Sequence, residues 1–290
     1  MSTIRTTVSL LALLLFSSAL AADEQRIERG RYLLHAGGCI TCHTVAQPQA
    51  DDFLAGGRAL ETPLGTFYSP NITPDTQTGI GLWTDEQFIA AFRYGLRPDG
   101  KRYYPAFPYS AYTGITDEDL LDLKAYLFSL EPVYRVKPRH ELSWFVSRIG
   151  MLFWNWLNFE PGVFEPDPNQ SEPWNRGAYL VRHLGHCGEC HTPRTWSGGL
   201  DPKRHLAGNR DGPYGERVPN ITPDRATGIG RWSVSDIEFF LDIGMLPNGD
   251  FTGGSMGPVI SDNTSHLTDA DRHAMAVYLR ALEPLPDAAD

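Results

Sequence analysis

Apolar residues recur along the chain mainly at helical spacing. Between Leu120 and Leu130 they follow an i, i+3, i+4 pattern, which predicts an amphipathic helix of about four turns. Four pairs of residues with the spacing of a capping box predict the starts of helices: Thr84 with Gln87, Thr116 with Asp119, Ser233 with Asp236, and Thr268 with Asp271. The pattern therefore predicts an all-α fold.

The chain contains an internal repeat. The hexapeptide Pro70–Asp75 recurs as Pro219–Asp224, 149 positions further on. A repeat of this length predicts two tandem homologous domains. We expect these domains at residues 22–132 and 171–286, joined by a linker over residues 133–170.

Each predicted domain contains a long loop rich in glycine and proline, at residues 63–81 and 213–230. Loops of this length without secondary structure are unusual in a compact domain unless they wrap around something. A prosthetic group in each domain would explain them.

The linker is rich in aromatic and aliphatic residues. Those within residues 144–159 include Trp144, Phe145, Ile149, Met151, Leu152, Phe153, Trp154, Trp156, Leu157 and Phe159. We expect the linker to pack across both domains and close their interface. A docking surface for a membrane or a partner subunit is the alternative, disfavoured because Arg148 is the only basic residue among them.

Composition and charge narrow the class of protein. Lys and Arg number 25 against 35 Asp and Glu, which gives a formal net charge of −10 and argues against nucleic-acid binding. Residues 1–21 have the features of a signal peptide: Arg5, an apolar run from Val8 to Phe16, and small residues before the expected cleavage after Ala21. We expect export to the periplasm; an uncleaved anchor is the alternative.

Two cysteine pairs carry the most specific chemical signal. Cys39 and Cys42 are followed by His43, and Cys187 and Cys190 by His191. Cysteines at i and i+3 on one helical turn can bond to the two vinyl groups of a haem, and the following histidine can bind its iron. The motifs therefore predict two covalently bound haem c groups.

Three other interpretations of the cysteine pairs explain less. A thioredoxin-like dithiol needs a βαβ setting, which the pattern does not contain. A zinc site would have to join the two domains and leaves the long loops unexplained. A disulfide within a CxxC segment would close too short a loop to stabilise the fold.

Soluble electron carriers usually bind the sixth position of the iron with a methionine thioether. Met256, in a glycine-rich loop, is the expected ligand in the second domain, with Met245 as its competitor. The repeat aligns Met256 with Phe107, which cannot bind iron. The first haem is therefore either five-coordinate or bound by a less usual ligand, for which the candidates are Tyr103, Tyr104, His140 and Met151.

Both halves resemble the cytochrome c family. The tandem arrangement is similar to the diheme region of the cytochrome c subunits of bacterial membrane-bound alcohol and gluconate dehydrogenases. The segments that carry this resemblance are Trp174–Leu180, Gly185–Gly188, both Asn-Ile-Thr-Pro-Asp motifs, and Ser265–Asp271. We expect neither the third haem domain nor the carboxy-terminal membrane helix of those subunits. The cysteine-ligated haem of thiosulfate dehydrogenases does not fit, because attachment uses all four cysteines.

The resemblance implies a pair of crossing helices in each domain, near Gly30 and Tyr126 and near Gly177 and Tyr278. It also implies that a proline carbonyl accepts a hydrogen bond from each iron-binding imidazole, with Pro63 and Pro213 as the candidates.

The function that follows is transfer of single electrons by a periplasmic diheme cytochrome. A dehydrogenase would donate the electrons, and another cytochrome or an oxidase of the respiratory chain would accept them. No catalytic residue is expected, and the protein is more naturally a carrier or an electron-transfer subunit than an enzyme. The alternative is a peroxidase-like diheme enzyme whose first haem has an open face.

Overall fold

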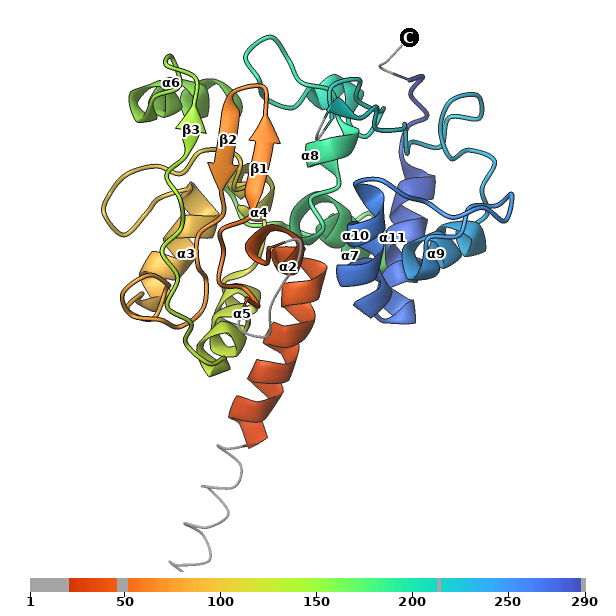
Figure 1. Ribbon diagram of the computed structural model, residues 1–290. Coiled ribbons are helices and arrows are strands. Elements are labelled where there is room, and N and C mark those ends of the chain that lie inside the picture. The colour runs from red at the N-terminus through yellow and green to blue at the C-terminus, as the bar shows by residue number, and fades with distance from the viewer. Residues whose placement is uncertain (1–20, 46–51, 213–214, 288–290) are drawn as a thin grey trace, which may run out of the picture.

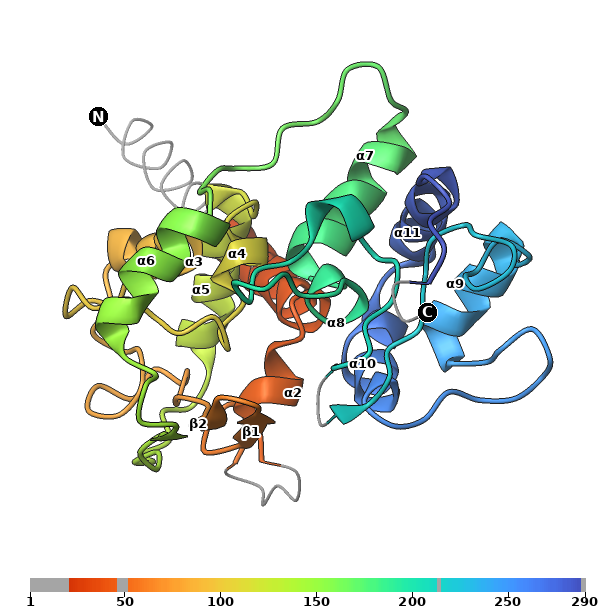
Figure 2. The ribbon, with the colours of Figure 1, turned by 90° about the horizontal axis from the view of Figure 1, so that it is seen from above.

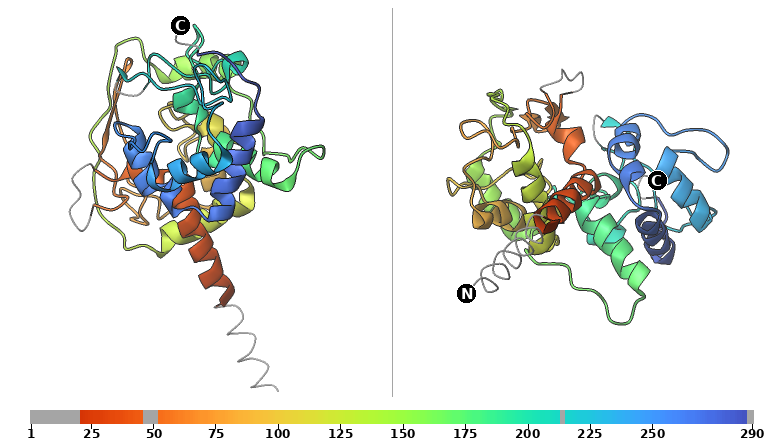
Figure 3. Two further views of the ribbon diagram at one scale, coloured as in Figure 1. Left: turned by 90° about the vertical axis from the view of Figure 1, so that its right-hand side faces the viewer. Right: turned by 90° about the horizontal axis from the view of Figure 1, so that it is seen from below.

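The computed structural model describes residues 21–45, 52–212 and 215–287, so the predicted signal peptide lies outside it except for Ala21 (Figure 1). Residues 21–36 form a helix that projects from the body of the molecule (Figure 3). The other helices of the N-terminal half, residues 21–132, are α2 (Cys39–His43), α3 (Asp85–Tyr94), α4 (Tyr109–Tyr112) and α5 (Asp117–Ser129).

The C-terminal half, residues 171–287, is built in the same order. Its helices are α7 (Glu172–Tyr179), η1 (Leu180–Leu184), α8 (Gly188–His191), η2 (Pro202–Arg204), α9 (Val234–Ile243), α10 (Met256–Asp262), η4 (Thr264–His266) and α11 (Asp269–Ala281). Helix α6 (Arg148–Asn158) lies between the two halves in sequence. Figure 2 shows α3 to α6 on one side of the molecule and α7, α9, α10 and α11 on the other, with α2 and α8 between them.

The predicted helix starts are confirmed. The side chain of each predicted N-cap residue accepts a hydrogen bond from the backbone N–H three residues later, at the starts of α3, α5, α9 and α11. In α3 and α9 the reciprocal bond of the capping box, from the N-cap N–H to the side chain of Gln87 or Asp236, is also present. Each of these contacts joins two residues within a four-residue segment, so it depends on the local sequence and not on distant parts of the fold.

A small sheet makes the fold mainly helical rather than all-α. Strands β1 (Ala59–Thr62) and β2 (Gly65–Tyr68) form an antiparallel hairpin, and β3 (Glu141–Leu142) pairs with β2. The prediction missed these strands because they are only two to four residues long, too short for an alternating pattern to stand out. The third strand comes from the predicted linker, so a contact distant in sequence completes the sheet.

The predicted helix crossings are confirmed. A Cβ atom built on Gly30 would lie 1.9 Å from the Asp122 carbonyl oxygen and 2.7 Å from the Tyr126 Cβ. In the C-terminal half, a Cβ on Gly177 would lie 2.0 Å from the Ala274 carbonyl oxygen and 2.7 Å from the Tyr278 Cβ. Only glycine permits the two helix backbones to approach this closely in each half.

Residues 141–159 differ from what we expected. The inner side of α6 contacts both halves: Tyr109 donates a 2.7 Å hydrogen bond to Asn155, and Ser197 donates one of 2.6 Å to Asn158. However, most of the apolar side chains expected at the domain interface are exposed: Trp144, Phe145, Ile149, Leu152, Phe153, Trp156 and Leu157. The two hydrogen bonds hold the side of α6 that bears Asn155 and Asn158 against the two halves, and most apolar side chains of the helix lie on its outer surface. Within the described residues, no helix is both long and apolar enough to cross a membrane.

Candidate functional site

The two cysteine motifs form matching short helices. Helix α2 starts after Gly38, whose φ of 66° reverses the chain between the first helix and Cys39. Cys187 is the N-cap of α8, so Cys187 and Cys190 also lie one helical turn apart. In the part of the chain that the structure describes, all four cysteines are free thiols rather than disulfides.

The environment of the thiols argues against a redox dithiol. Burial raises the pKa of Cys39 and Cys187 to about 12 and that of Cys190 to about 11. Reactive dithiols have lowered pKa values instead, because the thiolate is the nucleophile. The shifts are thus opposite in direction to those of a thiol-exchange pair.

His43 and His191 have the same hydrogen-bond partner in the two halves. Nδ1 of His43 lies 2.8 Å from the Pro70 carbonyl oxygen, and Nδ1 of His191 lies 2.8 Å from that of Pro219. The assignment of Pro63 and Pro213 to this role is therefore wrong, and Pro213 itself lies outside the described residues. Pro70 and Pro219 each begin the repeated hexapeptide.

These contacts set the protonation state of both rings. A carbonyl oxygen can only accept, so Nδ1 carries the proton and the lone pair of Nε2 is left to bind a metal. Burial lowers the pKa of both imidazoles, which keeps them neutral at pH 7. Both residues are nevertheless only half-buried by surface area, so neither is completely enclosed by the protein.

The repeated hexapeptides are held by matching asparagines. Asn71 Nδ2 donates to the Thr78 hydroxyl at 3.0 Å and to the Val133 carbonyl at 2.7 Å. Asn220 Nδ2 makes the corresponding bonds to Thr227 at 3.1 Å and to the Leu285 carbonyl at 2.7 Å. The asparagines therefore fix the loop that presents the proline carbonyl. The repeat located these residues, but the sequence did not show what they do.

The assignment of Met256 as the sixth ligand in the C-terminal half stays a prediction. Met256 is the first residue of α10, directly after the glycine-rich turn, and it is half-buried. Helix α10 packs against α2 and α9. The competing Met245 lies where a short antiparallel bridge joins it to Phe251, and it is half-buried too.

In the N-terminal half, Phe107 lies in a cluster of aromatic rings. Its ring centroid is 5.2 Å from those of Phe92 and Tyr103 and 5.6 Å from that of Tyr112. Burial raises the pKa of Tyr103 to about 12, so its phenol stays protonated and is a poor iron ligand. Apolar rings thus occupy the position where the other half has Met256.

His140 is poorly suited to be the substitute ligand. Its Nδ1 accepts a 3.0 Å hydrogen bond from the backbone N–H of Tyr68. Burial, reinforced by the charges of Lys137, Arg148 and Arg97, lowers the pKa of His140 to about 4. The neutral ring therefore carries its proton on Nε2 and has no free lone pair for a metal.

The other two candidates lie beside α6. The Tyr104 ring packs against His140, and the Arg148 guanidinium lies 4.7 Å from its centroid. Met151 is half-buried within α6. Tyr104 therefore contacts a histidine and an arginine, and Met151 belongs to the segment between the two halves.

Tyr112 connects the two cysteine motifs. Its hydroxyl donates a 2.6 Å hydrogen bond to the carbonyl of Gly37, two residues before Cys39. Its ring lies edge-on to that of His186, the residue before Cys187, with 5.2 Å between centroids. The segments that carry the two cysteine motifs therefore meet at one interface.

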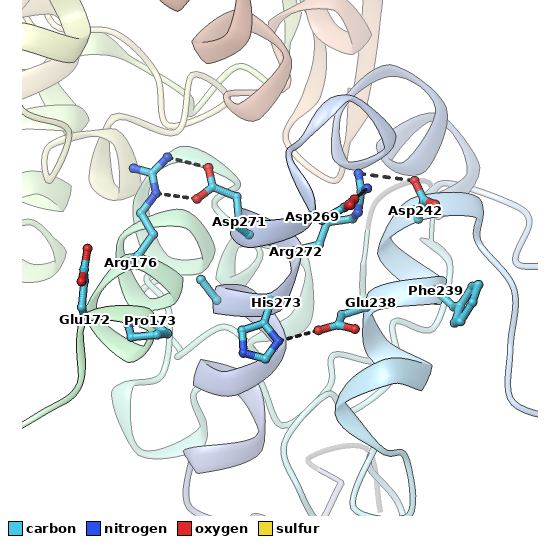
Figure 4. Close-up of a pocket in the computed structure, with 12 residues that line it drawn as sticks. Glu172, Pro173, Arg176, Glu238, Phe239, Asp242, Asp269, Asp271, Arg272 and His273 are labelled. Atoms are coloured by element: carbon cyan, nitrogen blue, oxygen red, sulfur yellow. Dashed lines mark hydrogen bonds and ion pairs between the residues drawn. The ribbon is translucent and has the colours of Figure 1, made fainter.

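A separate groove of about 840 Å³ lies between α7, α9 and α11 (Figure 4). Most of its charged residues are paired with one another: Arg176 with Asp271, Arg272 with Asp242 and Asp269, and His273 with Glu238. It contains neither cysteine motif, so it is distinct from the candidate sites.

Comparison with known proteins defines the family. The cytochrome c family matches residues 27–131. The chain is 43% identical to a diheme c-type cytochrome of Cereibacter sphaeroides, an alignment that covers 87% of this chain and 84% of the relative. It is 40% identical to the fructose dehydrogenase cytochrome subunit of Gluconobacter japonicus, over 90% of this chain and 54% of that subunit. It is 38% identical to the cytochrome c subunit of a quinone-dependent alcohol dehydrogenase of Gluconacetobacter polyoxogenes, over 94% and 60%.

The chain belongs to the cytochrome c family. It spans only 54% and 60% of the length of those two dehydrogenase subunits. Covalently bound haem c is the prosthetic group of the family, and the residues present fit it. Each motif offers two thiols one helical turn apart and a neutral imidazole whose Nδ1 is held by a proline carbonyl, which leaves Nε2 to bind a metal.

Proposed function

We propose that this protein is a periplasmic diheme cytochrome that passes single electrons from a dehydrogenase toward the respiratory chain. It would consist of two tandem cytochrome c domains, residues 22–132 and 171–286, joined by the aromatic-rich linker 133–170. The observation that carries the proposal is the duplicated contact between imidazole and proline carbonyl, at 2.8 Å in both halves. A single-haem carrier would need it only once.

In this proposal each motif holds one haem c. Cys39 and Cys42 attach the first and His43 binds its iron; Cys187, Cys190 and His191 do the same for the second. The group supplies reversible one-electron chemistry at its iron. The Pro70 and Pro219 carbonyls keep the proton on Nδ1 and make Nε2 a stronger donor, which favours the oxidised state.

The two sites would differ on their sixth side. Met256 would be the thioether ligand of the second haem, whereas Phe107 leaves the first without one. Because a thioether raises a haem potential, the two haems should have different potentials. The contact of Tyr112 with both motifs supports transfer between them.

The donor is inferred from the relatives. Several are cytochrome subunits of dehydrogenases, which act on fructose, alcohols or gluconate according to their names. Residues 1–21 support export to the periplasm, where c-type cytochromes of bacteria meet such donors. The acceptor would be another cytochrome or an oxidase.

The proposal is tested by an optical redox titration of the purified haem-loaded protein. Two one-electron transitions with different midpoints are expected. A single one-electron transition, in a protein that contains one haem per chain, would refute the diheme assignment. Turnover of hydrogen peroxide with a reduced electron donor, at enzymatic rates, would instead favour the peroxidase-like alternative.

A further inference from the structure

Helix α6 has the reverse of the usual arrangement for a surface helix. Ile149, Leu152, Phe153 and Trp156 follow an i, i+3, i+4, i+7 pattern and are 81%, 59%, 67% and 76% exposed. Surface helices normally turn such a stripe toward the core. In Figures 1 and 2, α6 lies at the periphery of the N-terminal half, and no element of the described residues buries this face.

The inner face of α6 is held by polar contacts as well as by the Trp154 ring, which packs edge-on against Tyr109. Asn155 accepts a hydrogen bond from the buried Tyr109 hydroxyl, and Asn158 accepts one from Ser197. The Arg148 guanidinium donates to the Arg102 carbonyl. These three contacts fix the rotation of the helix about its axis, so the apolar stripe cannot turn inward without breaking them.

The segment before the helix extends the apolar face. Trp144 is 94% exposed and Phe145 is 58% exposed. Together with the stripe they form a surface with a tryptophan at each end, which we call the α6 face: Trp144, Phe145, Ile149, Leu152, Phe153 and Trp156. Apart from the two indole N–H groups, none of these side chains can donate or accept a hydrogen bond.

Basic residues gather beside the α6 face, although the whole chain has a net charge of −10. The segments 97–102 and 137–148 contain six Lys or Arg residues and only two acidic ones. The hydrogen bond from Arg148 to the Arg102 carbonyl joins the first segment to the helix. The Arg97 guanidinium lies 5.9 Å from the centroid of the Tyr103 ring, and that of Arg148 lies 4.7 Å from the centroid of the adjacent Tyr104 ring, so both cations border the same segment.

We propose that the α6 face binds the surface of an anionic phospholipid membrane. The apolar centre would enter the boundary between headgroups and acyl chains, where no hydrogen bonds are needed. The terminal tryptophans suit the headgroup level, because the indole has an apolar body and one polar N–H. The neighbouring Arg and Lys side chains would contact lipid phosphates. This attachment is peripheral and does not depend on the identity of the electron donor.

The test uses the mature haem-loaded protein and vesicles of phosphatidylglycerol mixed with phosphatidylcholine, in a flotation assay. Binding is expected, weaker on pure phosphatidylcholine and weaker at high salt because screening reduces the electrostatic part. The double variant Ile149→Asp, Phe153→Asp should bind at least about tenfold more weakly, since it removes two apolar anchors and adds two negative charges.

The matched control is Leu82→Asp, Phe239→Asp, which makes the same change in charge at two side chains that are 74% and 54% exposed elsewhere. It should bind vesicles more strongly than the α6 variant and retain most of the parent's affinity. Absence of vesicle binding by the parent, or equal binding by both variants, would overturn the proposal. A dimer in solution that the α6 variant abolishes, without vesicle binding, would assign the face to a second copy of the chain instead.

Discussion

The phenol of Tyr179 donates a 2.7 Å hydrogen bond to the carboxylate of Asp119, which lies in the opposite half of the chain. The phenol oxygen of Tyr179 also accepts a hydrogen bond of 3.2 Å from the backbone N–H of Thr116, the N-cap of α5. Arg29, from the half that contains Asp119, binds that carboxylate as well. A tyrosine of one half thus completes an ion pair and a helix cap of the other.

The reciprocal arrangement is also present. Tyr32 donates to Asp271 and accepts from the N–H of Thr268, the N-cap of α11, while Arg176 binds Asp271 at 2.8 Å. The two halves are therefore joined by two copies of one cluster, related by an approximate twofold axis. This symmetry brings the two cysteine motifs to the same interface.

We predict that Tyr179→Phe lowers the free energy of unfolding by about 1–3 kcal/mol, because it removes a donor to a carboxylate that is 4% exposed. Thermal or denaturant unfolding of the haem-loaded protein measures this change. Tyr126→Phe is the control, since that hydroxyl makes no hydrogen bond within the described residues. Equal stability of Tyr179→Phe and the parent would show that the cluster does not hold the halves together.

Gly177→Ala should destabilise the C-terminal half by roughly 3 kcal/mol or more, since the added Cβ would lie 2.0 Å from the Ala274 carbonyl and overpack the helix crossing. Gly162→Ala provides the control, because a Cβ there meets no atom within 4 Å. The readout is thermal unfolding together with the haem content per chain. A fully stable Gly177→Ala variant would contradict the close approach of α7 and α11.

Phe107→Met should convert the first haem to histidine–methionine ligation. We expect its potential to rise by on the order of 0.1 V, a fraction of the ~0.8 V over which axial ligands shift haem potentials. The methionine-to-iron charge-transfer absorption should grow as well. Optical redox titration and near-infrared absorption measure the two effects.

The control for this variant is Phe92→Met, which introduces a thioether into the same aromatic cluster, 5.2 Å from Phe107 between ring centroids, but not at the position aligned with Met256. It should leave both the potential and the absorption band near those of the parent. Two methionine-ligated irons in the parent protein would mean that the alignment of Phe107 with Met256 is wrong.

Features set by local sequence could be predicted, and features set by distant contacts could not. The caps of α3, α5, α9 and α11 depend on residues three apart, and the crossings at Gly30 and Gly177 follow from the family resemblance. The sheet needs β3, a two-residue strand far along the chain. The carbonyl partners were misassigned to Pro63 and Pro213 because several prolines lie in each loop and only the fold selects among them.

The exposure of α6 could not be predicted for a related reason. Its composition is that of a buried helix, and apolar periodicity does not show which side faces the core. The hydrogen bonds of Asn155 and Asn158 decide that orientation, and their partners Tyr109 and Ser197 lie in different halves. Likewise, the bond from the Tyr68 N–H makes His140 a poor ligand, which its sequence position does not reveal.

The most direct test of the account is the intact mass of the haem-loaded protein and of its Cys187→Ala, Cys190→Ala variant. The parent should carry the mass of two covalently attached haem groups, and the variant should carry one. Retention of two covalent haems by the variant, or a single haem on the parent, would contradict the assignment of one haem to each cysteine motif.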